Sequence, residues 1–181
     1  PGKYNIKMTY NNQILQKEFE IVKDPRVKIS QADYENQLEF LINVRDEVSR
    51  ANQKIIDIRN IKNNMIFISE KTRDNIELQE MINNYLTDVS EIENNIHMTK
   101  NQSRQDPLNY GIRINNRIAF LLADSQRGDY PPTDQSKEFF IQIKKELDTE
   151  ILKLDALIDK HSQKIENYLE ENKIELISLN N

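Results

Sequence analysis

The longest regular pattern in the chain runs from Phe140 to Tyr168 and reads FIQIKKELDTEILKLDALIDKHSQKIENY. Its apolar residues recur every three or four positions, which is the spacing of one face of an α-helix. The positions on this stripe are Phe140, Ile143, Leu147, Ile151, Leu154, Ile158, His161, Ile165 and Tyr168. Thr133 or Asp134, just upstream, is suited to cap the start of the helix. A long helix with one narrow stripe has to bury that stripe against other helices.

Two more segments have the same helical spacing. One helix is predicted from about Ser30 to about Ile68, and a second ends near Lys100. A break between them is expected around NNMIFISEKT, residues 63–72. The expected inward stripes are Tyr34, Leu38, Leu41, Arg45, Val48, Asn52 and Ile55 in the first helix, and Leu78, Ile82, Tyr85, Val89, Ile92 and Ile96 in the second.

A short helix is predicted over residues 110–126. Its inward positions are Ile114, Ile118, Leu121 and Leu122. Helices near 40 residues are about 60 Å long, and each offers one stripe to its neighbours. The predicted fold is therefore mainly α: an antiparallel three- to four-helix bundle with long helices.

The N-terminal segment has strand periodicity instead. Residues 3–23 alternate in polarity around a turn at NNQ, so a β-hairpin is expected to precede the bundle. The residues on its apolar face are Tyr4, Ile6, Met8 and Tyr10 in the first strand, and Leu15, Lys17, Phe19 and Ile21 in the second. Pro25 disfavours helix at Asp24, so we expect a hairpin at 1–24 and a helical bundle at 25–181. Because an isolated hairpin is only marginally stable, it either packs on the helices or ends a sandwich domain lying upstream.

Composition excludes several classes of function. The chain has 181 residues, a net charge of −5 and no cysteine. An acidic chain with mixed charges lacks the basic face typical of nucleic-acid binding. The absence of cysteine excludes disulfides, thiol catalysis and cysteine-based zinc sites. No apolar run reaches 18 residues, so no membrane-spanning segment is expected.

Catalytic and cofactor motifs are not evident. His97 and His161 are the only histidines, and they do not form a metal-binding pair such as HExxH. His161 falls on an apolar stripe, where a histidine is more often a core residue than a ligand. Carboxylate pairs such as Glu91 and Glu93 are typical of solvated helix faces. We expect this chain itself to be non-catalytic and to carry no cofactor or metal.

One polar stretch, NQSRQDPLNYGIRINNRIAFLLAD at Asn101–Asp124, interrupts the helical pattern. The first part, Asn101–Tyr110, is predicted as an ordered loop. Polar residues here and on the first helix are expected to form a hydrogen-bonded network that closes one end of the bundle and sets its register. These residues are Asp106, Asn109, Tyr110, Arg113, Asn115, Arg45 and Asn52. The alternative interpretation is a small-ligand site at the loop.

Three segments together resemble a known family. They are DPRVKISQADYENQLEFLINVRDEVSRAN at Asp24–Asn52, NQSRQDPLNYGIRINNRIAFL at Asn101–Leu121, and PPTDQS at Pro131–Ser136. Their combination resembles the C-terminal region of sortilin-like, BNR (Asp-box) repeat proteins, often labelled glycosyl hydrolases in bacteria. The resemblance covers Pro1 to about Tyr168. This chain departs from it at Arg104-Gln105 and in its longer, Lys- and Glu-rich C-terminal end.

The resemblance implies a larger parent protein. In that family a β-propeller fills most of the chain, followed by a sandwich-like segment and then a helical tail. Any catalytic carboxylates would then lie in the propeller, upstream of the helical tail. Such parents are exported, so the resemblance implies a periplasmic or extracellular location.

The expected function is that of a non-catalytic C-terminal helical module with a structural or interaction role. Its expected partners are the upstream propeller domain of the same chain and, beyond it, another protein, without nucleic acid. Two alternatives stay open. The loop at Asp106–Arg113 would serve as an accessory part of a glycoside hydrolase active site that upstream residues complete, or the bundle would be a helical sensor or adhesin that binds a protein partner along its flank.

Overall fold

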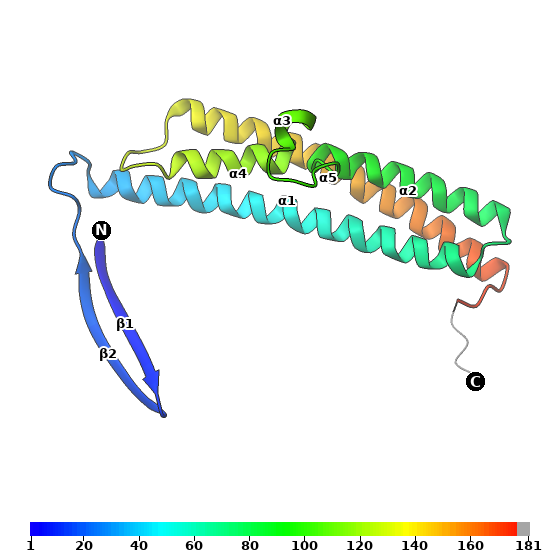
Figure 1. Ribbon diagram of the computed structural model, residues 1–181, viewed down its shortest axis with the longest axis horizontal. Helices are drawn as coiled ribbons and strands as arrows, with labels where there is room; N and C mark the ends of the chain where they lie inside the picture. The colour runs from blue at the N-terminus through cyan, green and yellow to red at the C-terminus, as the bar shows by residue number, and fades with distance from the viewer. Residues whose placement is uncertain (177–181) are drawn as a thin grey trace.

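The computed structural model of the protein describes residues 1–176 (Figure 1). Two strands come first, β1 (Gly2–Tyr10) and β2 (Gln13–Ile21). Within this range five helices follow: α1 (Gln31–Lys71), α2 (Ile76–Ile96), α3 (Pro107–Tyr110), α4 (Ile114–Ser125) and α5 (Asp134–Glu171). The predicted class, a bundle of long helices preceded by a β-hairpin, is confirmed.

The bundle has three rods side by side, and the middle rod is interrupted. Along α1, rising residue numbers contact falling residue numbers, first in α4 and then in α2. Gln37 donates a hydrogen bond to the Ser125 carbonyl, and Arg59 pairs with Glu93. α2 and α4 therefore lie end to end along α1 and run against it, as Figure 1 shows. α5 runs in the same direction as α1, because Glu47 pairs with Lys144 and Lys54 with Asp155.

Local sequence sets the helix starts. Ser30 and Asp33 form a capping box in which each side chain accepts from the backbone N–H of the other residue. Asn75 caps α2, and Thr133, one of the two expected candidates, caps α5. The expected break around residues 63–72 lies at the C-terminal end of that stretch, because α1 continues past Ile68 to Lys71 and the turn follows it. Met65 is buried and continues the inward stripe of α1 through this segment. At the end of the helix, the Thr72 hydroxyl donates to the Ile68 carbonyl.

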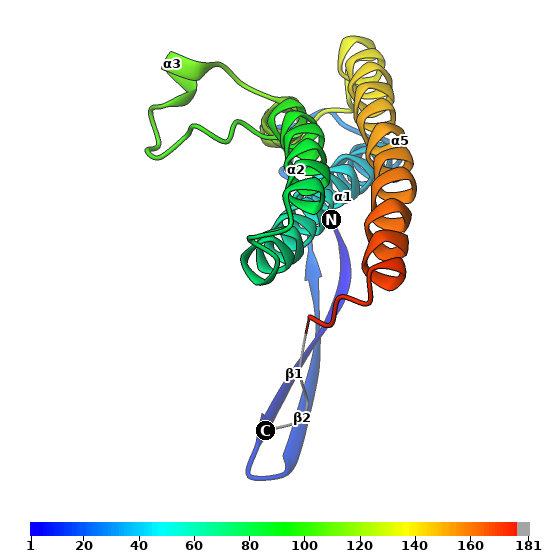
Figure 2. The same cartoon turned by 90° about the vertical axis from the view of Figure 1, so that its right-hand side faces the viewer.

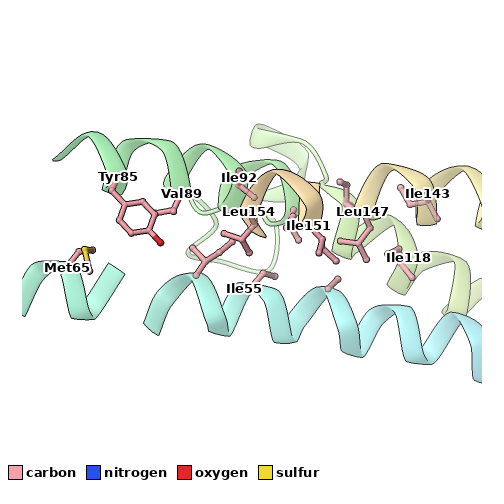
Figure 3. Packing of buried hydrophobic residues seen from close by; sticks show 14 of the residues in the cluster. Ile55, Met65, Tyr85, Val89, Ile92, Ile118, Ile143, Leu147, Ile151 and Leu154 are labelled. Carbon is pink, nitrogen blue, oxygen red and sulfur yellow. The ribbon is translucent and has the colours of Figure 1, made fainter. Parts of the chain in front are cut away.

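The core forms one continuous apolar seam between the rods (Figure 3). All six predicted inward residues of α2 are buried. Ile143, Leu147, Ile151, Leu154 and Ile165 of α5 are buried as predicted, and the other predicted stripe residues of α5 are half-buried. In α4, Ile114, Ile118 and Leu121 point inward, and Leu122 is half-buried.

The predicted stripe of α1 is wrong in its N-terminal half. The buried positions are Gln37, Phe40, Val44, Glu47 and Ala51, one residue before the expected ones. One residue corresponds to a rotation of about 100° around the helix axis. The two polar members are tolerated inside because they have partners there. The Gln37 amide donates to the carbonyls of Ser125 and Gly128, and the Glu47 carboxylate accepts from Lys144 and Arg50.

Ion pairs between the rods reinforce this register. The Glu93 side chain is 4% exposed and accepts hydrogen bonds from Arg59 and Lys62, each at 2.9 Å. Arg117 of α4 pairs with Glu146 of α5. A carboxylate this buried is stabilising only with its partners in place, so these pairs specify how the rods align.

The hairpin stands clear of the helices in both views (Figure 1, Figure 2). Its strands pair in antiparallel register with Tyr4 opposite Phe19 and Ile6 opposite Lys17. The turn is tighter than the predicted NNQ, since only Asn11 and Asn12 lie between the strands, with φ of 46° and 63°. Asparagine tolerates this left-handed backbone better than most residues do, which suits it to a two-residue hairpin turn.

Candidate functional site

The polar loop predicted to close one end of the bundle lies elsewhere. Residues 97–113 join α2 to α4 about halfway along the bundle, and α3 projects outward from it (Figure 1, Figure 2). The expectation failed because α4 continues the line of α2 instead of turning back. The loop is therefore an insertion between two halves of one rod.

Asp106 organises the loop internally. Its carboxylate accepts hydrogen bonds from the backbone N–H groups of Gln102 and Ser103, at 2.6 and 2.8 Å, and from the Ser103 hydroxyl at 2.6 Å. The Ser103 hydroxyl bond, with the two backbone bonds, lowers the pKa of Asp106. All three bonds stay within the loop, so Asp106 does not link neighbouring helices as expected.

The seven predicted network residues are not brought together. Arg45 is exposed and pairs with its neighbour Asp46, and Asn52 is also exposed. Asn109 and Tyr110 are exposed on α3. Of the seven, Asn115 contacts another helix of the same rod: its amide nitrogen lies 3.2 Å from Nδ1 of His97, which caps the end of α2. The one-residue rotation of α1 explains the loss of Arg45 and Asn52.

Several unpaired polar atoms belong to the loop and to the start of α4. Asn101 Oδ1, Arg113 Nε, Asn115 Oδ1 and Asn116 Oδ1 are shielded from solvent and have no hydrogen-bond partner within residues 1–176. A buried polar group without a partner costs about 1–3 kcal/mol. The sequence signal for this feature was the Asn115-Asn116 pair, which interrupts the apolar pattern at the start of this helix.

His161 occupies the α2–α5 interface. Its ring stacks on Tyr85 at a centroid distance of 4.9 Å, and its Nε2 lies 3.2 Å from Oδ2 of Asp88. The Tyr85 hydroxyl lies 3.4 Å from the Ser162 hydroxyl. The aromatic stacking makes His161 part of the packing between α2 and α5. Within residues 1–176, no group of three or more His, Asp or Glu side chains is arranged to hold a metal ion.

A second candidate site is the apolar face of the hairpin. Seven large side chains on this face are between 46% and 68% exposed: Tyr4, Ile6, Met8, Tyr10, Leu15, Phe19 and Ile21. Tyr4 and Phe19 stack across the strands at 5.8 Å. The other face carries Lys3, Lys7, Glu18 and Glu20. The hairpin is thus amphipathic, and its apolar face has no cover within the described chain.

This face continues onto α1. A shallow recess of about 270 Å³ lies between the hairpin and the start of α1, lined by Pro1, Tyr4, Gln31, Tyr34, Glu35, Gln37, Leu38 and Leu41. Tyr34, Leu38 and Leu41 belong to the stripe that the sequence placed in the bundle core. The Tyr34 hydroxyl donates to Asp129 at 3.1 Å. Burial, as the larger cause, and this hydrogen bond both raise the pKa of Tyr34. We name the apolar hairpin face together with Tyr34, Leu38 and Leu41 the hairpin corner.

Sequence reasoning missed this corner because α1 carries two overlapping stripes in its first turns. Phe40 and Val44 serve the bundle core, and Tyr34, Leu38 and Leu41 serve the recess. In the sequence, this corner was indicated by apolar residues that cover a wider face of α1 than one helix–helix contact can bury. No described helix is long and apolar enough to cross a membrane. Comparison with protein-family models, with curated proteins and with solved structures found no match to this chain.

Proposed function

We propose that this chain is a non-catalytic helical module whose stiff bundle carries an interaction surface, the hairpin corner. The observation that carries the proposal is the exposed apolar face of the hairpin, which continues onto Tyr34, Leu38 and Leu41 of α1. Exposed apolar patches of this size mark interaction sites in soluble proteins. A structural role follows, because a surface of this kind joins two bodies.

The construction of the bundle supports the same role. Buried Glu47 and Glu93 are each paired to two cations. The pairs of Glu93 with Arg59 and Lys62, and of Glu47 with Lys144, cross between rods. Such pairs set register rather than provide a cleft for substrate. A rod aligned in this way holds the corner at a defined position relative to its far end.

The resemblance extends the proposal to a parent protein. The module would then be the C-terminal tail of an exported, sortilin-like propeller protein, in the periplasm or outside the cell. The propeller of the same chain is the proposed neighbour, and any glycosidase chemistry is assigned to that propeller. The β-character of the hairpin supports a β-rich neighbour immediately upstream.

A stability comparison tests whether the corner is a binding surface. The double variant Tyr4→Ser, Phe19→Ser should melt at the same temperature as the unmodified chain, because neither side chain packs in the bundle core. The control Ile82→Ala removes a fully buried side chain and should lose about 2–5 kcal/mol of unfolding free energy. Helix melting followed by circular dichroism measures both. A double variant as unstable as the control would make the hairpin part of the core and end the proposal.

An enzyme assay tests the non-catalytic part. The purified chain should not hydrolyse aryl glycosides or glycans above a heat-inactivated control. Turnover that a single carboxylate substitution removes would refute this part of the proposal.

A second candidate function rests on the unpaired atoms of the loop and of the start of α4. In the parent protein, the loop would complete an active site whose other residues lie upstream, with Arg113, whose buried Nε has no partner within residues 1–176, as its cationic residue. Arg113→Ala would then lower kcat/KM of the full-length enzyme without changing the melting temperature of the bundle. Unchanged kinetics with that substitution would assign the loop to structure alone.

A further inference from the structure

The two faces of the hairpin differ in what they need from a partner. On the polar face, Lys3 lies opposite Glu20, and Lys7 lies opposite Gln16. Charged and polar side chains such as these are hydrated when they face water. The opposite face presents apolar side chains over the length of both strands. Only that face requires a covering layer.

We infer that the hairpin corner is the docking site for one face of a β-sheet from a separate domain, and that this sheet presents a carboxylate opposite Lys17. The inference rests on the proposed function, because it names the partner of the same surface. It adds the class of partner and the charge that the partner must carry.

The exposed area matches a lasting interface. A large side chain of this kind can bury roughly 150–250 Å² in all, and each of the seven keeps about half of its surface exposed, so together they offer roughly 700 Å². One partner in a standard protein–protein interface contributes about 800 Å². Tyr34, Leu38 and Leu41 extend the surface around the corner onto α1. The partner therefore has to contact both the hairpin face and the start of α1, which requires a folded domain rather than a single added peptide.

The backbone of the hairpin favours a β-sheet as that body. Each strand is nine residues long and pairs on one side only, so both outer edges carry unpaired N–H and C=O groups. Such edges allow the hairpin to be extended by further strands into a wider sheet, and a second sheet can then cover the apolar face of that sheet. Two sheets packed face to face also lie about 10 Å apart and interdigitate their side chains along the whole strand length.

Lys17 distinguishes a separate domain from a second copy of this chain. It is the only charged residue on the apolar face and lies opposite Ile6, in the middle row of the five pairs that share this face. Suppose that two copies stack face to face with their bundles pointing in opposite directions. The first cross-strand pair of one copy then lies over the fifth pair of the other. The middle row would meet itself, and Lys17 would lie against Lys17 of the other copy. Like charges in a desolvated interface cost several kcal/mol, whereas a carboxylate there would be attracted.

Photo-cross-linking in the full-length protein, expressed in its own cells, tests the inference. A benzophenone amino acid is placed at Ile6 on the apolar face, or at Asn5 on the polar face as the matched control. We expect the Ile6 position to cross-link to one strand of a β-sheet outside residues 1–181, and the Asn5 position to give little product. Mass spectrometry of the cross-linked peptide identifies the partner segment.

Charge reversal makes the test specific. Lys17→Glu should lower the yield at the Ile6 position by about tenfold or more, the loss expected when a buried charge pair is broken. Exchange of the partner's nearby carboxylate for lysine should restore the yield in the Lys17→Glu background. Lys17→Met, which keeps the side-chain length without charge, is the control for packing.

Three results would overturn the inference. One is a cross-linked peptide from residues 1–181 of a second copy, recognised by mixing isotopically labelled and unlabelled protein. Another is a yield at Ile6 equal to that at Asn5, and the third is a partner segment that is helical. Each differs from failure of the proposed function, which would appear as glycosidase turnover or as destabilisation by the corner variants.

The purified chain provides an independent check. Sedimentation should find it monomeric, and Lys17→Leu should make it self-associate by removing the like-charge repulsion. A dimer of the unmodified chain that Tyr4→Ser dissociates would assign the corner to a second copy instead.

Discussion

Single buried carboxylates align this bundle, and Glu93 is the clearest case. Burial alone would raise the pKa of Glu93, but hydrogen bonds from Lys62 and Arg59 outweigh burial and lower it. Both cations come from α1, whereas Glu93 lies on α2. A group whose folded pKa is lowered stabilises the fold above its ordinary pKa, and that contribution disappears as the pH falls through the folded value.

We predict that Glu93→Ala lowers the unfolding free energy by about 1–3 kcal/mol, because two charge-assisted hydrogen bonds are lost while the partly exposed Arg59 and Lys62 remain solvated. In the unmodified chain, stability should fall below pH 4.5, the ordinary pKa of this carboxyl. Urea denaturation at a series of pH values measures both effects. The variant should show a weaker loss of stability in acid. A variant with an unchanged acid profile would exclude Glu93 as a source of the pH dependence.

Asp106 acts over a shorter range. Its bonds tie Gln102 and Ser103 to the start of α3 and reach no other rod. We predict that Asp106→Ala leaves helix melting unchanged but speeds hydrogen exchange at the two backbone N–H groups, by roughly tenfold for the loss of such bonds. Exchange mass spectrometry reports this locally. A lowered melting temperature would instead support the bundle-wide network that the sequence predicted.

At the scale of elements, the hairpin and the bundle share a short connection but no core. Ile29 is buried where the connection meets α1, and Lys23 donates to the Ile29 carbonyl at 3.0 Å. The apolar face of the hairpin remains exposed beyond that point. One sequence alternative, a hairpin packed on the helices, is therefore not the arrangement in this structure.

Deletion of residues 1–23 should leave the helical content per residue of the rest unchanged, because α1, α2, α4 and α5 form the seam by themselves. Circular dichroism of the truncated chain measures this. The exposed apolar surface should also decrease, seen as reduced binding of a hydrophobic dye. Collapse of the helices on truncation would show that the hairpin and bundle fold as one unit.

At the scale of the whole molecule, the three rods make an elongated body. α1 alone has 41 residues, about 60 Å at 1.5 Å per residue. α2 and α4 share the length of α1 between them, and the loop with α3 emerges where they meet (Figure 1). Length is the property that a spacer or brace requires.

Small-angle X-ray scattering should give a radius of gyration clearly above about 16 Å, the value expected for a compact chain of this size. The distance distribution should extend beyond the length of α1 and have the asymmetric form of a rod. A symmetric distribution with a radius near the compact value would show that the rods fold back on one another in solution.

The sequence by itself determined the helices, their caps and the amphipathic hairpin, because these depend on periodicity and on neighbours a few residues away. The α2 stripe and the Ser30 and Thr133 caps are examples. It did not determine which of two stripes on α1 faces the core. Gln37 and Glu47 are stable inside only beside Ser125 and Lys144, which are 88 and 97 residues away. Burial of a polar side chain depends on partners that only the packed rods supply, so the tertiary structure decided the α1 register, the mid-rod position of the loop and the hairpin corner.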